Sequence, residues 1–195
     1  MNSDQILEHF KETDALLEGH FILSSGLHSP KYLQCARALQ YPFDAAKFGK
    51  AIAEHFTDAE IETVASPAIG GLIIGYEAAK ALNVRFIWTE RENGVMTLRR
   101  GFSVKENEKI LVVEDVITTG GSTRECIEAL EKNGAKVVGA ASIIDRSNGA
   151  ANVGVPRIAL ASLDVPTYKT KDCPMCAKGE KAVKPGSNLM VNGKW

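Results

Sequence analysis

The chain has 195 residues, of which 45% are hydrophobic and 24% are charged, and its formal net charge is -1. This apolar content is enough to bury a complete core without disulfides or a structural metal, and the near-zero charge gives no broad attraction to nucleic acid or to an anionic membrane. The start MNSDQILEHFKE does not resemble a signal peptide, and no apolar run approaches the ~20 residues of a spanning helix. We therefore expect a cytoplasmic protein that binds neither nucleic acid nor membrane.

Hydrophobic periodicity predicts helices alternating with strands. The first helix is expected over residues 3–17, with Ser3 as a possible N-cap, and a β-rich segment over residues 20–35. Further helices are expected at residues 43–56, 70–82 and 122–133, and strands at 63–66, 85–88, 110–113, 136–144 and 157–162. This order predicts a single α/β domain over residues 1–195, with a mostly parallel sheet flanked by helices.

Three loops should converge on residues 114–115, because ligands of parallel sheets lie beyond the carboxyl ends of the strands. They span residues 66–71, 89–102 and 145–150. The first, SPAIGG, contains glycines that let the backbone approach an anion. We interpret it as a pyrophosphate loop, and the alternative is a plain turn into an Ala-rich helix.

The second loop, TERENGVMTLRRGF, carries Arg91, Arg99 and Arg100 around an Asn93-Gly94 turn. That dipeptide between extended segments predicts a hairpin-like excursion. A mobile loop rich in arginine can close over a substrate, exclude water and neutralise a departing pyrophosphate. A solvated basic hairpin is the alternative.

Residues 110–122, ILVVEDVITTGGS, are the most informative segment. Four aliphatic residues predict a strand buried on both faces, which delivers Glu114 and Asp115 to the edge of the sheet. The loop residues that can surround an anion at the start of a helix are Val116, Ile117, Thr118, Thr119, Gly120, Gly121 and Ser122.

This loop lacks the lysine of a nucleotide-triphosphate loop, and the chain lacks GxGxxG. An acidic pair before an anion cradle can hold two ribose hydroxyls while the cradle binds the 5′-phosphate of the same sugar. We therefore predict a site for a phosphorylated sugar. The alternative is an ordinary strand, turn and helix with a solvated acidic edge.

The cysteines Cys35, Cys126, Cys173 and Cys176 are too few for a disulfide framework and are expected to be thiols. Cys173 and Cys176 form a single CxxC in a tail over residues 165–195, without the second pair that a structural zinc site needs. His28 or Cys35 could complete such a site only through folding. The CxxC therefore has three alternative interpretations: a metal site, a plain tail or a redox-prone pair. His20 is expected to lie at the surface or to serve in packing.

Residues 114–122, EDVITTGGS, resemble the 5-phosphoribosyl-1-pyrophosphate (PRPP) motif of the type I phosphoribosyltransferases. Other segments are similar to the orotate phosphoribosyltransferases in particular, so that the resemblance covers about residues 21–185. These segments are FILSSGLHSPKY from residue 21, TERENGVMTLRRGF, the strand end Ile144-Asp145-Arg146, and the tail CPMCAKGEKAVKPGS.

The resemblance implies a type I phosphoribosyltransferase fold with a small β-rich hood over the active site, formed by about residues 1–40 with a possible carboxyl-terminal contribution. It also implies transfer of phosphoribose from PRPP to orotate, giving orotidine 5′-monophosphate and pyrophosphate in de novo pyrimidine (UMP) biosynthesis. The cofactor would be Mg²⁺, held through substrate and water. The protein would be a homodimer with a shared active site, in which a loop of one subunit reaches the other's site.

The resemblance assigns catalysis to Glu114, Asp115, Arg99 and Arg100. It assigns PRPP binding to the acidic pair, to residues 116–122 and to Arg91. It assigns orotate binding to Thr118 and Arg146. Arg146 can donate in-plane hydrogen bonds to orotate, and a local ion pair between Asp145 and Arg146 is the alternative.

Two positions depart from the better-known branch of the family, which has lysines where this chain has Ser24 and Gly70. Both departures remove a cation expected near the pyrophosphate, and the arginine loop is the expected source of compensating charge. Two other functions remain open. One is a type I phosphoribosyltransferase for a purine base, and the other is a PRPP-sensing or nucleotide-sensing regulator of the same fold that binds RNA.

Overall fold

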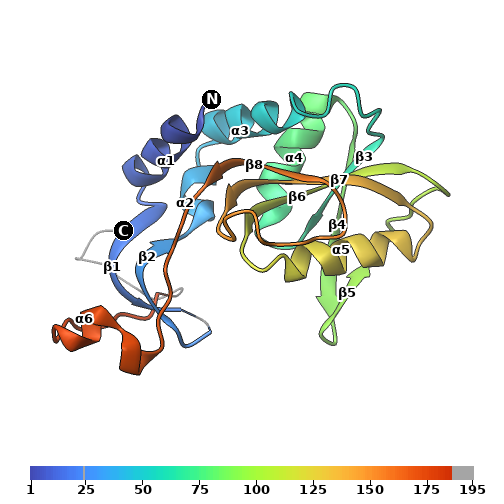
Figure 1. The fold of residues 1–195 in the computed structure, drawn as a ribbon. Helices are drawn as coiled ribbons and strands as arrows, with labels where there is room; N and C mark the ends of the chain where they lie inside the picture. The colour runs from blue at the N-terminus through green and yellow to red at the C-terminus, as the bar shows by residue number, and fades with distance from the viewer. Residues whose placement is uncertain (24, 186–195) are drawn as a thin grey trace.

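The computed structural model describes residues 1–23 and 25–185, and its helices and strands alternate along the chain (Figure 1). No helix within these two ranges combines the length and hydropathy needed to cross a bilayer. The elements are α1 (Ser3–Glu12), β1 (Leu16–Ile22), β2 (His28–Leu33), α2 (Cys35–Leu39), α3 (Pro42–Ala53), β3 (Thr63–Pro67), α4 (Gly71–Leu82), β4 (Arg85–Glu92), β5 (Val95–Leu98), β6 (Lys109–Ile117), α5 (Gly121–Glu131), β7 (Lys136–Asp145), β8 (Arg157–Ser162), η1 (Thr170–Asp172) and α6 (Pro174–Ala177).

A six-stranded sheet lies at the centre, in the order β5-β4-β3-β6-β7-β8. Neighbouring strands are parallel except for β5, which pairs antiparallel with β4 at one edge. Helices α3 and α4 cover one face and α5 covers the other (Figure 1). The carboxyl ends of β3, β4, β6 and β7 therefore meet along one edge, which is where parallel sheets bind ligands.

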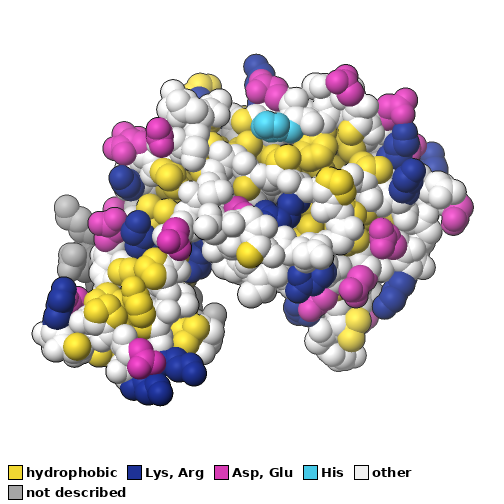
Figure 2. Space-filling model, viewed as in Figure 1, with side chains coloured by type: hydrophobic (Ala, Val, Ile, Leu, Met, Phe, Trp, Pro, Cys, Tyr) yellow, Lys and Arg dark blue, Asp and Glu magenta, His cyan; other side chains and the backbone are white. Residues whose placement is uncertain are grey.

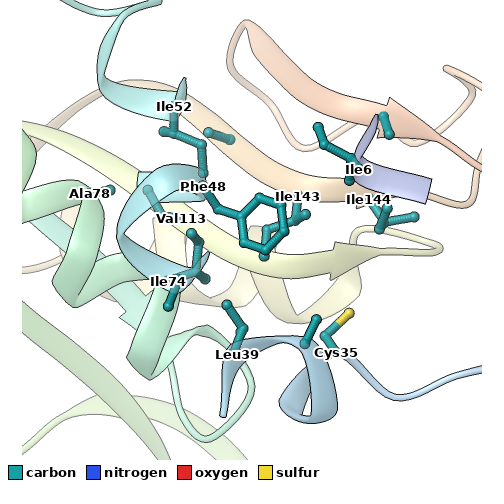
Figure 3. Packing of buried hydrophobic residues seen from close by; sticks show 14 of the residues in the cluster. Ile6, Cys35, Leu39, Phe48, Ile52, Ile74, Ala78, Val113, Ile143 and Ile144 are labelled. Atoms are coloured by element: carbon teal, nitrogen blue, oxygen red, sulfur yellow. The ribbon is translucent and has the colours of Figure 1, made fainter. Parts of the chain in front are cut away.

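Phe48 of α3 lies at the centre of the larger core and is fully buried. Figure 3 shows its ring among Ile74, Val113 and Ile143, which come from α4, β6 and β7. Burying a side chain of this kind contributes about 2 kcal/mol. Residues 110–113 are all fully buried, as an unbroken aliphatic run predicts. Strand β6 is therefore a fixed support for the residues at its end.

A smaller sheet, β1 with β2, forms a hood to one side of the main sheet (Figure 1). The carboxyl-terminal segment is hydrogen-bonded to it at two places. His28 and Tyr168 exchange two backbone bonds of 2.8 Å, and Val183 donates to His20 and accepts from Ile22, also at 2.8 Å. The expected fold class, a mostly parallel α/β sheet flanked by helices with a small β-rich hood, is confirmed.

Helix α1 begins at residue 3 as predicted, but its N-cap is one residue earlier than predicted. Asn2 is the N-cap, and Ser3 is the first helical residue. The Asn2 side chain accepts from the Gln5 N–H at 2.9 Å, and the Gln5 side chain accepts from the Asn2 N–H at 3.0 Å. This capping box satisfies two backbone donors at once, which a cap at Ser3 would not do.

The end of α1 was predicted too late. The helix ends at Glu12, and Asp14 has φ of +53°, a left-handed conformation that a right-handed helix cannot include. Leu16 instead begins β1, because the hairpin partner β2 lies opposite it. The β-rich segment also ends earlier than expected, since Cys35 is the first residue of the short helix α2.

Candidate active site

Strand β6 ends at Ile117, four residues later than predicted. Glu114 and Asp115 are therefore part of the strand instead of following it. Successive side chains of a strand point to opposite faces. Glu114 accordingly faces α5, where Thr123 Oγ1 donates to its Oε2 at 3.5 Å. Asp115 lies on the α4 side, close to Gly70. The two carboxyl groups therefore reach the end of the sheet from its two faces.

A pocket of about 310 Å³ opens at this end of the sheet. It brings together two segments that the sequence predicts to converge, the 66–71 loop and the end of β6. Its lining residues are Pro67, Ala68, Gly70, Glu114, Asp115, Val116, Ile117, Thr118, Thr119, Gly120, Gly121, Ser122 and Thr123. Every residue of the motif predicted to contact PRPP lines this one pocket.

The loop between β6 and α5 has the features of an anion cradle. Thr118, Thr119 and Ser122 are exposed and bring hydroxyl groups to the pocket. Gly120 has φ of +74°, which lets the chain turn into α5 at Gly121. The unpaired N–H groups and the positive dipole end of this 11-residue helix favour a phosphate at that position.

The acidic pair is poorly solvated. Burial, together with the neighbouring charge of Asp115, raises the pKa of Glu114 to about 9, against the opposing hydrogen bond from Thr123. Burial also raises the pKa of Asp115, against the opposing N–H of Val116, which donates to Oδ1 at 2.8 Å. Two poorly solvated carboxylates on neighbouring residues, one buried and one half-buried, are costly unless donors or a cation meet them. The pocket therefore suits a ligand that carries several hydroxyl groups.

The loop before α4 approaches the acidic pair through its backbone. A Cβ on Gly70 would lie 2.8 Å from Asp115 Oδ1, so the close approach requires glycine unless the carboxylate moves. This contact gives a physical reason for the lack of a side chain where the better-known branch has lysine. The second departure, Ser24, lies outside the described residues.

Arg146 follows the last residue of β7 and lies beside the end of β6. Its backbone N–H donates to Ile117 O at 2.8 Å. Asp145 is not its partner, because that carboxylate accepts from Arg157 at 3.1 Å and from the Ser147 hydroxyl at 2.6 Å. Within the described part of the chain, the buried Nε of Arg146 has no hydrogen-bond acceptor. A buried donor of this kind costs free energy unless a ligand satisfies it.

The arginine loop forms the predicted hairpin. Glu92 and Val95 pair across the turn, and Asn93 and Gly94 both have positive φ, at 50° and 84°. This geometry is that of a two-residue type I′ turn. The hairpin leaves the main sheet beside α5, and its tip projects below that helix in the view of Figure 1.

The three loop arginines do not line the 310 Å³ pocket of their own chain. Arg99 pairs with Glu92 at 3.2 Å, Arg100 pairs with Glu90, and Arg91 pairs with Glu125 of α5. Arg91 and Arg100 instead line a neighbouring pocket of about 390 Å³, which shares Ala68 with the first.

Sequence reasoning missed Cys35 as a neighbour of the site. Burial raises the pKa of this thiol well above its usual value, and the charges of Asp115 and Glu114 add to that effect while Arg146 opposes it. The thiol is therefore neutral and close to both the acidic pair and Arg146. No local pattern marks it, because α2 meets the site only in the folded chain.

Comparison with known proteins agrees with this geometry. The family described as phosphoribosyl transferase domain matches residues 42–154, more than half of the chain. The orotate phosphoribosyltransferase of Caldicellulosiruptor bescii is 52% identical over 187 residues, which cover 96% of this chain and 98% of that protein. The enzyme of the same name from Thermotoga maritima is 52% identical over 93% of this chain and 97% of its own length.

A crystal structure of orotate phosphoribosyltransferase from Aeropyrum pernix superposes with a TM-score of 0.69 at 28% identity, covering 81% of this chain and 93% of that one. An adenine phosphoribosyltransferase from Thermoanaerobacter pseudethanolicus shares the fold alone, at a TM-score of 0.59 and 15% identity. The fold is thus common to enzymes that act on different bases. The 52% sequence identity over nearly the whole chain is what distinguishes the orotate enzymes from the adenine enzymes here. The chain belongs to the phosphoribosyltransferase family and, within it, to the orotate phosphoribosyltransferases.

Proposed function

We propose that this protein transfers the 5-phosphoribosyl group from PRPP to orotate, giving orotidine 5′-monophosphate and pyrophosphate in pyrimidine biosynthesis. The observation that carries the proposal is the juxtaposition of three features at one sheet edge. These are the anion cradle at the start of α5, the poorly solvated acidic pair and the unsatisfied Nε of the Arg146 guanidinium. A phosphorylated sugar fits the first two, and a planar base carrying a carboxylate fits the third.

In this arrangement the 5′-phosphate lies in the cradle formed by residues 118–122, and the ribose hydroxyls donate to Glu114 and Asp115. The hydroxyls add donors to those from Thr123 and Val116, so sugar binding favours the ionised form of the acidic pair and lowers both pKa values. Holding the ribose at both ends fixes the position of C1. Positioning and fixed charge together can contribute several kcal/mol to catalysis.

The reaction breaks the bond between C1 and a pyrophosphate oxygen and the N–H bond of an orotate ring nitrogen, and it forms a bond between C1 and that nitrogen. The proton leaves to pyrophosphate or water. Positive charge develops on the ribose, where the ionised acidic pair stabilises it, and negative charge develops on the leaving pyrophosphate. The loop with Pro67, Ala68 and Gly70 offers backbone groups to the pyrophosphate and no side-chain cation. The positive charge that neutralises the leaving pyrophosphate must therefore come from outside this loop.

The carboxylates of the pocket fit Mg²⁺ only if substrate and water supply most of its ligands. Glu114 and Asp115 are the two carboxylates in the lining of the pocket, too few to enclose an ion that takes six oxygen ligands. They suit an ion held mainly by substrate oxygens and water, as the sequence predicts. When bound, Mg²⁺ would neutralise pyrophosphate oxygens as a Lewis acid.

The catalytic function is favoured over that of an RNA-binding regulator by the surface. On the face drawn in Figure 2, Lys and Arg side chains are interspersed with Asp and Glu rather than gathered into a basic stripe. The near-neutral net charge points the same way. The cytoplasmic location stays a prediction.

The base specificity is tested by offering orotate, uracil, adenine, hypoxanthine and xanthine separately with PRPP and Mg²⁺. Consumption of each base is followed by ultraviolet absorbance. We expect turnover of orotate alone, because uracil lacks the carboxylate that would pair with Arg146. Turnover of a purine but not of orotate contradicts the proposal, and PRPP binding without any turnover favours a regulator.

We also propose a homodimer in which the arginine loop of one subunit serves the partner's site. In its own chain the loop is held away from the pocket by Glu90 and Glu92. Two apolar residues in and before α4 are exposed, Ile69 in the preceding loop at 83% and Tyr76 in the middle of the helix at 57%, and they would be covered by a second subunit. Binding of pyrophosphate would then compete with the two glutamates for the arginines.

Arg99→Ala and Arg100→Ala should each lower activity while changing the melting temperature little, because exposed ion pairs contribute little to stability. Mixing Arg100→Ala with Asp115→Asn subunits should restore about a quarter of wild-type activity, since half of the dimers then contain one intact site. Each variant mixed with itself is the control. Failure to regain activity despite verified subunit exchange means that the loop serves its own subunit.

A further inference from the structure

Four potential metal ligands meet in the hood, and none of them lines the pocket described above. His20 lies on β1 and His28 begins β2, while Cys173 and Cys176 flank the start of α6 in the tail. One nitrogen or sulfur atom from each lies within 4.8 Å of all the others. The sequence shows only the CxxC, and folding adds a histidine pair from about 150 residues upstream.

The distances within this cluster match those between ligands of one tetrahedral ion. Zinc bonds of about 2.0–2.1 Å to nitrogen and 2.3 Å to sulfur place a nitrogen and a sulfur ligand about 3.5 Å apart. The Sγ of Cys173 lies 3.5 Å from His20 Nε2, and the Sγ of Cys176 lies 3.7 Å from the same atom and 3.4 Å from His28 Nδ1. The two ring nitrogens are 2.7 Å apart and would separate to about 3.3 Å around an ion.

The outer nitrogens of both rings have partners that orient them. His20 Nδ1 lies 2.8 Å from the carbonyl oxygen of Glu180, which can only accept, so this nitrogen carries the proton and Nε2 presents a lone pair to the cluster. His28 Nε2 lies 3.3 Å from Thr170 Oγ1. Ligating histidines in proteins are held in this way, with the second ring nitrogen donating to a carbonyl or hydroxyl group.

The cluster is also shielded from solvent. Cys173 is 2% exposed, His28 5% and His20 6%, and Cys176 is half-buried. All four positions are filled by protein atoms, which is typical of a structural site rather than a catalytic site with an open position. Two thiolates and two imidazoles favour Zn²⁺ among the common divalent ions.

We propose that His20, His28, Cys173 and Cys176 bind one structural zinc ion that fastens the carboxyl-terminal segment to the β1–β2 hairpin. A two-stranded sheet has too little core to be stable alone. The backbone bonds at Tyr168 and Val183 place the tail along the hairpin, and the ion would fix the turn between them. The hood over the active site would thereby keep its shape in the absence of substrate.

Metal content is the first test. The full chain is reconstituted with zinc under reducing conditions, freed of excess metal by gel filtration and assayed by mass spectrometry. We expect about one zinc per chain, falling at least tenfold in Cys176→Ala and His20→Asn. The matched controls Cys126→Ala and His55→Asn, which lie outside the cluster, should keep their zinc. Cobalt in place of zinc should give the d–d absorption of a tetrahedral thiolate site.

Thermal unfolding is the second test, and its main comparison uses the wild-type chain with and without zinc. Removing zinc from the wild-type chain with a chelator should lower its melting temperature by about 5–10 °C, and the same chelator should not affect Cys176→Ala. The proposal is wrong if the reconstituted wild-type protein holds no zinc, or holds no more zinc than Cys176→Ala does. It is also wrong if the freshly reduced protein rapidly forms a Cys173–Cys176 disulfide instead of binding the ion.

Discussion

Glu114→Gln should make the free protein more stable and the enzyme less active. Burial raises the pKa of Glu114 to about 9 from an unperturbed 4.5, so the folded chain binds more protons than the unfolded chain between these values. Stability contributed by the protonated carboxyl is therefore complete at low pH and is lost as the pH rises from about 4.5 towards 9. The amide cannot ionise, so the variant should melt at a higher temperature than wild type at pH 8.5 and at a similar one at pH 5.

The same substitution removes an acceptor for a ribose hydroxyl and a charge near the developing cation. We expect kcat/KM for PRPP to fall at least tenfold in Glu114→Gln and in Asp115→Asn, since one interaction of ~1.4 kcal/mol in the transition state already has that effect. The exposed Glu106 provides a control, and Glu106→Gln should change neither property. Near-native activity in both pocket variants would remove the acidic pair from the mechanism.

Arg146→Ala should lower kcat/KM for orotate at least 100-fold, while the affinity for PRPP measured by calorimetry stays close to that of wild type. The guanidinium is partly desolvated, and burial lowers its pKa from the usual value. Arginine side chains stay protonated in proteins, so the positive charge is available to a ligand. Its buried Nε awaits an acceptor, and a charge-assisted pair with the orotate carboxylate contributes ~2–3 kcal/mol.

Two substitutions sharpen this test. Arg146→Lys keeps the charge but not the planar fork, and it should recover only part of the loss. Arg37→Ala removes an arginine of α2 that pairs with Asp14 away from the pocket, and it should leave kcat/KM unchanged. Unchanged use of orotate by Arg146→Ala would show that the base binds elsewhere.

Local patterns in the sequence predict the main sheet and the sugar-phosphate pocket well. The aliphatic run at residues 110–113, the acidic pair and the Thr/Gly/Ser loop are adjacent in the chain, so the strand, the cradle and their order could be read directly. The strand predicted at residues 157–162 matches β8. Asn93-Gly94 likewise encodes its turn locally, through the positive φ that both residues adopt.

The features that could not be predicted depend on contacts between distant residues. Nothing near Leu16 shows that its partner strand begins at His28, and nothing near Cys173 shows that His20 lies beside it. The direction in which a charged side chain points also cannot be predicted from local sequence. Arg99 and Arg100 pair with Glu92 and Glu90 across the hairpin, and the sequence alone does not show whether they face these glutamates or the pocket.

The most direct test of the proposed reaction measures pyrophosphate release from PRPP by the purified chain with Mg²⁺, with and without orotate. We expect release only when orotate is present, with one orotidine 5′-monophosphate formed for each pyrophosphate, because the transfer couples the two bonds at C1. Pyrophosphate release that is independent of orotate, or orotate that remains unconsumed while PRPP binds, would contradict the proposed phosphoribosyl transfer.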